Sequence, residues 1–181
     1  KIDEHDEQIK LSFENDETKK YDYLIISDGV FSKSKSLISN NKAKPKYNNT
    51  LAIRGVLTKF PENIDNKNIS LFLDSDFHHV IYPLSPNGDF NFIAIIKYHL
   101  SDEEQKNYSL FKDNSFKKKV LEKIPLKNKN FLNYLKNLKI FPVFVSDSFY
   151  QLQNKNIHLI GDAFFAFPPS FVQGASQSIE G

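Results

Sequence analysis

The alternation of apolar and polar residues predicts strands at the start of the chain. Residues 8–13 alternate strictly, which is typical of a half-buried strand. Turn-forming residues follow, and residues 21–26 resume an apolar pattern, so the opening predicts a β-hairpin. Residues 23–26 are continuously apolar, which indicates a strand covered on both faces. After the break at Ser27-Asp28-Gly29, we expect a short helix over residues 32–38.

The middle of the chain predicts an antiparallel sheet followed by helices. Consecutive strand-like segments are joined by short turns, the clearest being Pro86-Asn87-Gly88-Asp89. The expected strands are residues 51–60, 69–73, 78–84, 90–98 and 140–150. Ser101, followed by three acidic residues, marks a helix start. Two further helices are expected at residues 115–123 and 130–138.

The last part of the chain has the same plan as residues 23–38. A short apolar strand at residues 156–160 ends in Gly161-Asp162, and a helix begins near Gly174 after a proline-bearing loop. The polar linker at residues 40–49 is the best candidate for a domain crossing. These alternating elements predict an α/β (α+β) fold.

Composition narrows the class of protein. The 181 residues carry 40% hydrophobic side chains, 14% aromatic side chains and a formal net charge of +2, which suits one core or two small domains rather than disorder. The lysines are scattered, so we expect no nucleic-acid partner. The lack of cysteine excludes disulfides, thiolate nucleophiles and Cys-ligated metals. No apolar run reaches the roughly 20 residues of a membrane span, and a cytoplasmic location is expected. The absence of methionine suggests that residues 1–181 lie inside a longer protein.

Two acidic turns, each following an apolar strand, carry the candidate chemistry. They contain Asp28-Gly29 and Gly161-Asp162. In open α/β sheets, ligands bind beyond the carboxyl ends of the strands, where a carboxylate accepts hydrogen bonds from ribose hydroxyls. A neighbouring glycine lets the backbone approach a pyrophosphate closely. Either turn alone is a common structural feature, but the two together, in this order and with these flanks, are a much more specific signal.

The order and flanks of these turns resemble the FAD-dependent aromatic monooxygenases of the para-hydroxybenzoate hydroxylase type, including salicylate hydroxylase-like and ubiquinone-pathway hydroxylases. The family pattern Asp-Gly-x-x-Ser-x-x-Arg is matched by residues 28–35, with Lys35 in the arginine place. The later pattern Gly-Asp-Ala-Ala-His, proline, Gly-Gln-Gly is matched by residues 161–174, with Phe164-Phe165 replacing Ala-His and Val172 replacing the first glycine. The N-terminal Gly-x-Gly-x-x-Gly unit is absent, so the resemblance implies a fragment, which is expected to be inactive by itself.

The resemblance implies a partial FAD-binding Rossmann-like domain with an inserted antiparallel-sheet substrate domain. Residues 1–44 and 151–181 would belong to the FAD-binding domain and residues 45–150 to the substrate domain. NAD(P)H would be the co-substrate and a small aromatic or quinone-like compound the substrate; a quinone precursor would allow membrane association. The implied cofactor-binding residues are Asp28, Gly29, Gly161, Asp162, Ala163, Pro168, Pro169, Gln173 and Gly174. Arg54 and Tyr82 are the candidate substrate residues.

Several readings stay open on sequence alone. A reductase or halogenase would share the FAD frame, and a noncatalytic α/β module would use both turns structurally. Arg54 is equally suited to anchor a substrate carboxylate or to pair with a structural acid. The phenylalanines of residues 164–171 suit an aromatic pocket or the core. His78 and His79 are neighbours in a strand, so their side chains point to opposite faces and do not converge on one metal ion.

Overall fold

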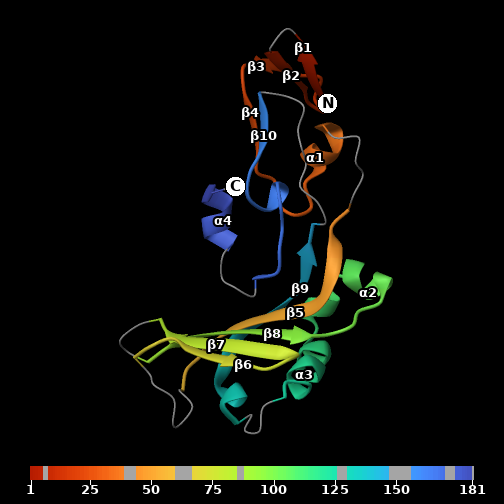
Figure 1. The fold of residues 1–181 in the computed structure, drawn as a ribbon. Helices are drawn as coiled ribbons and strands as arrows, with labels where there is room; N and C mark the ends of the chain where they lie inside the picture. The colour runs from red at the N-terminus through yellow and green to blue at the C-terminus, as the bar shows by residue number, and fades with distance from the viewer. Residues whose placement is uncertain are drawn as a thin grey trace. The chain divides into compact units, whose positions relative to one another are not determined.

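The chain divides into two compact units in the computed structural model. The structure describes residues 1–5, 8–38, 44–59, 67–84, 88–125, 130–146, 156–169 and 174–180. Unit 1 is formed by Lys1–Lys46 together with Phe144–Gly181, and unit 2 by Tyr47–Val143. Unit 1 is therefore built from the two ends of the chain, whereas unit 2 is continuous in sequence (Figure 1).

Unit 1 contains two small sheets and short helices. One sheet is antiparallel, in the order β1 (Ile2–His5), β2 (Gln8–Ser12), β3 (Thr18–Tyr21). The other is the parallel pair β4 (Leu24–Ile26) and β10 (Ile157–Leu159), which lie side by side in Figure 1. The helical elements are α1 (Lys33–Ile38), the 3-10 turn η3 (Gly161–Ala163) and α4 (Gly174–Glu180). Its buried core is formed by Ile9, Ile26, Ile157, Leu159 and Ala163.

The structure corrects two expectations for the opening segment. The expected strand at residues 21–26 is two strands: β3 completes the hairpin with β2, whereas β4 pairs with β10. The strand at residues 23–26 is also not covered on both faces, because Tyr23 is 68% and Ile25 62% exposed while Ile26 is buried. The continuous apolar run therefore predicted more burial for this segment than the described residues show. The expected helix over residues 32–38 is confirmed as α1.

Unit 2 contains a five-stranded sheet, and side chains of its helical elements share the core with residues of the sheet. The strand order is β6 (Ser70–Leu73), β7 (Phe77–Pro83), β8 (Phe90–Lys97), β5 (Lys46–Leu57), β9 (Leu135–Val145). Neighbouring strands from β6 to β5 pair antiparallel, which confirms the expected mixed fold with an antiparallel sheet. The helical elements are α2 (Asp102–Lys106), η1 (Leu110–Lys112), α3 (Asn114–Glu122) and η2 (Asn130–Tyr134). Phe116 and Val120 of α3 join the sheet residues Phe92 and Ile53 in the core.

The helix expected at residues 130–138 is wrong beyond its first turn. Residues 130–134 form the 3-10 element η2, and β9 begins at Leu135. Leu132 joins the core from η2, whereas Leu135 and Leu138 pack against the core from the extended chain of β9. The strand expected at 140–150 is described to Val145, and the Pro86-Asn87 part of the expected turn lies outside the described residues.

Gly55 lies where β5 and β9 are close together. A Cβ atom built on Gly55 would lie 2.6 Å from Leu135 Cδ1 and 3.0 Å from the backbone oxygen of Lys136. Real Cβ atoms do not approach neighbours this closely, so glycine permits this packing of β5 against β9.

His79 is buried in the core of unit 2. It is 3% exposed, and its ring stacks on Phe72 with centroids 4.3 Å apart and planes 4° apart. Its Nδ1 atom has no hydrogen-bond partner among the residues that the structure describes. Burial lowers the pKa of His79 to about 4, with a smaller contribution from His78. Among the described residues no group of three metal-ligating side chains occurs, and none of the described helices is both long and apolar enough to cross a bilayer.

Candidate functional site

The parallel pairing of β4 and β10 brings the two acidic turns to one edge. Leu24 is opposite Ile157 and Ile26 opposite Leu159, and the Ile160 amide donates to the Ile26 carbonyl at 3.0 Å. Because both strands run in the same direction, the turns that follow them leave from the same end of the pair. Asp28 and Asp162 are therefore located beyond the carboxyl ends of neighbouring strands.

The first turn is closed by hydrogen bonds to the start of α1. Gly29 has a φ of 81°, a conformation that glycine adopts without steric cost. The Ser34 amide donates to Asp28 Oδ2 at 3.1 Å. Partial burial raises the pKa of Asp28, but hydrogen bonds from Ser32 and Ser34 together outweigh it and hold the pKa below its ordinary value. Asp28 thus caps a helix in this structure, and its carboxylate is kept ionised.

The second turn carries an exposed carboxylate, that of Asp162. Gly161 has a φ of 58°, and its carbonyl accepts from the Phe164 amide at 2.9 Å and the Phe165 amide at 3.0 Å. Ala163 is 1% exposed and anchors the turn in the unit 1 core. Asp162 is exposed, and its side chain makes no hydrogen bond or ion pair with any residue the structure describes. This turn therefore holds a carboxylate outward from a fixed backbone.

The loop and helix beyond this turn are described in part. A Cβ atom on Gly161 would lie 3.2 Å from Ser178 Oγ, so α4 packs closely against the turn. Gly174 is the first residue of α4, whereas Gln173 lies outside the described residues. Pro168 is half-buried and Pro169 exposed, and the rings of Phe165 and Phe167 stack at 5.9 Å.

Lys35 is a residue whose role the sequence did not reveal. It is 9% exposed, and its Nζ atom donates to the Phe164 carbonyl at 3.0 Å, across 129 residues of sequence. Burial lowers the pKa of Lys35. The signal available in the sequence was its position at the end of the Asp-Gly pattern, which did not indicate a contact with the second turn.

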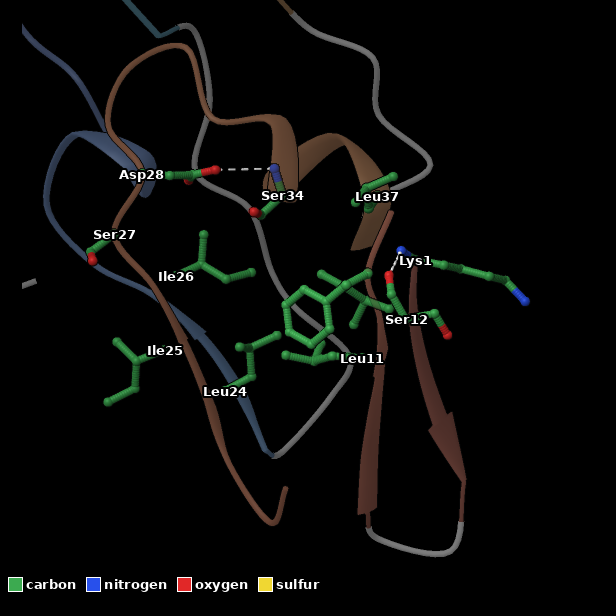
Figure 2. A pocket seen from close by; sticks show the side chains of 12 residues that line it. Lys1, Leu11, Ser12, Leu24, Ile25, Ile26, Ser27, Asp28, Ser34 and Leu37 are labelled. Carbon is green, nitrogen blue, oxygen red and sulfur yellow. Dashed lines mark hydrogen bonds between the residues drawn. The ribbon is translucent and has the colours of Figure 1, made fainter. Parts of the chain in front are cut away.

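A cavity of about 390 Å³ opens beside the first turn. Its lining is mostly apolar, and Figure 2 shows Leu11, Leu24 and Ile26 on one side of β4 and Ile25 on the other. Asp28 and Ser34 form a polar end of this cavity. Residues 161–163 are not part of its lining, so the cavity adjoins one acidic turn only.

The candidate substrate residues share one face of the unit 2 sheet. Arg54 is paired with Ile93, and Tyr82 is paired with Asn91. Phe90 and Phe92, which flank Asn91, belong to the core, so strand alternation puts Arg54, Tyr82 and Asn91 on the opposite face. Arg54 is exposed and has no acidic partner in the described part of the chain. Two roles were expected for Arg54, and the described residues provide no acid for the second of them, a structural ion pair.

No protein-family model matches the chain, and no curated protein matches it significantly. Solved structures do. HpxO of Klebsiella pneumoniae, complexed with FAD and uric acid, matches with a TM-score of 0.71 at 16% identity, over 99% of this chain and 46% of that chain. A salicylate hydroxylase substrate complex matches with a TM-score of 0.70 at 18% identity, over 99% of this chain and 48% of that one. The 2,6-dihydroxypyridine-3-hydroxylase of Arthrobacter nicotinovorans matches with a TM-score of 0.69 at 17% identity, over 99% and 52%.

The matches cover nearly all of this chain, and the chain spans about half the length of each of these structures. In fold, the chain is therefore similar to about half of an FAD-dependent aromatic hydroxylase.

Proposed function

We propose that the chain supplies part of the FAD site and much of the substrate-binding sheet of a monooxygenase that hydroxylates an aromatic or quinone-like compound with NAD(P)H and O2. The observation that carries this proposal is the parallel pairing of β4 and β10, with an acidic turn beyond the carboxyl end of each strand. Ligands of open α/β sheets bind at this end of the strands. The fold likeness to hydroxylases supports the same assignment.

The residues at this edge suit a dinucleotide cofactor. The Asp162 carboxylate is exposed and faces no protein partner among the described residues, so it is available to accept hydrogen bonds from ribityl or ribose hydroxyls. A Cβ atom on Gly29 would meet no atom of the described residues within 4 Å, so the backbone there is open to close approach by a phosphate. Asp28, by contrast, is engaged by α1, and we assign it to shaping the turn beside the pyrophosphate.

The remaining roles follow the family resemblance. Gly161 and Ala163 would fix the turn that carries Asp162, Pro168 and Pro169 would form the rigid loop beside the flavin ring, and Gln173 and Gly174 would present amides to its carbonyl edge. Bound FAD would supply the redox and oxygen chemistry. In unit 2, Arg54 and Tyr82 would orient the aromatic substrate from the face of the sheet opposite Phe90 and Phe92.

A second function is favoured by one observation. The hydrogen bonds of Asp28 to α1 are what a purely structural turn would make, as expected of a noncatalytic α/β module. Such a module would be colourless once free FAD is removed from a mixture of the two. A flavin reductase or halogenase of the same fold would bind FAD and consume NAD(P)H without releasing a hydroxylated product.

The test is flavin retention by the full-length protein as the cell makes it. Asp162→Ala should weaken FAD binding about tenfold or more, because one charged acceptor contributes roughly 1.5–3 kcal/mol. Asp22→Ala is the matched control, since Asp22 is exposed in unit 1 but precedes β4 instead of following it. Equal FAD occupancy in the two variants, measured by absorbance of the bound flavin, would remove Asp162 from the site.

A further inference from the structure

Lys35 is a buried cation on the short helix that follows the first acidic turn. Lysine is rarely buried unless its ammonium group has a partner, and Lys35 is only 9% exposed. Its Nζ atom donates to the carbonyl oxygen of Phe164 at 3.0 Å. The Lys35 side chain therefore links α1 by a hydrogen bond to the segment that carries the second acidic turn.

The accepting residue is part of the turn itself. The Phe164 amide donates to the Gly161 carbonyl at 2.9 Å and so closes the 3-10 turn around Asp162. A bond that holds the Phe164 carbonyl fixes the peptide at the end of this turn. The direction in which the Asp162 carboxylate leaves the backbone then depends on the position of Lys35.

The first turn of α1, which carries Lys35, is also hydrogen-bonded to the first acidic turn and its flank. Asp28 Oδ2 accepts from the Ser34 amide at 3.1 Å, and Ser32 Oγ accepts from the Lys35 amide at 2.9 Å. Hydrogen bonds therefore run from the Asp28 turn through α1 and the Lys35 side chain to the Asp162 turn. The strand pairing of β4 with β10 ends at Ile26 and Leu159 and does not extend into the two turns. The hydrogen bonds through α1 therefore connect parts of the chain that the strand pairing does not.

We infer that Lys35 is a positioning residue that sets the Asp162 turn relative to the Asp28 turn for binding the dinucleotide. This inference rests on the proposed function, since it assigns Lys35 a role in the same site. Lys35 acts through the Phe164 carbonyl. An arginine at this position keeps a charged donor, whereas an apolar side chain of similar length keeps only the buried stem.

The test compares Lys35→Met, Lys35→Gln and Lys35→Arg with Lys33→Met in the full-length protein. Lys33 is an exposed lysine of the same helix, so its replacement controls for the loss of one positive charge from α1. Two quantities are measured: hydrogen exchange of the Phe164 and Phe165 amides without flavin, and the dissociation constant for FAD. Lys35→Met should speed exchange at both amides and weaken FAD binding, each about tenfold or more. Lys35→Arg should recover most of both.

Lys35→Gln keeps the inference testable if Lys35→Met does not fold. The inference is overturned if Lys35→Met, or Lys35→Gln in its place, leaves amide exchange at wild-type rates, or speeds exchange without weakening FAD binding. It is also overturned if Lys33→Met weakens FAD binding as much. A wild-type protein that ignores FAD would instead sink the proposed function, and the exchange measurement would still report whether Lys35 holds the turn.

Discussion

The buried imidazole of His79 should make the stability of unit 2 depend on pH. The pKa of His79 is lowered from 6.5 to about 4, chiefly by burial, so the folded state holds the ring neutral while the unfolded state takes up a proton near its ordinary pKa. The stabilising effect is therefore complete above about pH 6.5. It is lost as the pH falls from there towards 4, because the unfolded state binds more protons over this range.

The size of this effect follows from the two pKa values. Linkage predicts that His79 alone lowers the free energy of unfolding by about 2 kcal/mol at pH 5 and about 3 kcal/mol at pH 4. The ring stacks on Phe72, and its Nδ1 atom has no hydrogen-bond partner among the described residues. No described group in the core therefore accepts a hydrogen bond from a proton added at Nδ1. His79→Phe replaces the titrating ring by a neutral one and should remove this part of the pH dependence.

The measurement is urea unfolding at pH 7, 6 and 5, followed by amide NMR signals of β7 and β8. The comparison uses the slope of the unfolding free energy against pH, because a change in packing shifts all three values alike. His99→Gln, at an exposed position, controls for losing an imidazole outside the core. Equal slopes for the wild type and His79→Phe would refute the reasoning, as would an NMR titration of His79 with a midpoint near 6.5.

Three further changes test the packing and the turns. Gly55→Ala should destabilise unit 2 by about 1–3 kcal/mol, because its Cβ would meet Leu135 Cδ1 at 2.6 Å. Combining Gly55→Ala with Leu135→Ala should recover part of the lost stability. An unchanged urea midpoint for Gly55→Ala alone would contradict the close packing. Gly29→Ala should cost about 1–2 kcal/mol through its φ of 81° alone, since the space around it is open, and thermal unfolding of unit 1 checks this. Ser101→Ala should cost about 1 kcal/mol, because Ser101 and Glu104 form a capping box at the start of α2; an unaltered melting temperature would argue that α2 does not unfold with the sheet.

Local patterns predicted most elements because each depends on neighbours in sequence. The helix at Ser101 was found from its cap, and the strands of unit 2 from apolar segments separated by turns. The helix expected at residues 130–138 was wrong beyond residue 134 because the chain passes from the 3-10 element η2 directly into β9, which lies beside β5 in the sheet. Pairing with a distant strand overrode the local preference there.

The candidate site divides in the same way. The sequence located both acidic turns, since each has a strand before it and a glycine beside its aspartate. It did not show that the Asp28 carboxylate is bonded to α1 while that of Asp162 is exposed and has no partner among the described residues. It also did not show that Lys35 reaches Phe164, because this contact joins segments far apart in the chain. The exposure of Tyr23 and Ile25 also could not be predicted, because the hydropathy of a segment does not show which elements pack against it.

The pairing of β4 with a strand near the far end of the chain has a consequence for biosynthesis. Unit 2 is continuous, so a ribosome releases all of its strands before β10 is made. Domains generally fold as they emerge, whereas contacts between remote segments must wait for closure of the intervening loop. β4 therefore remains without its parallel partner during synthesis of the whole intervening segment. A nascent chain stalled before residue 156 should expose Ile26 to chaperones even when the five-stranded sheet is already formed.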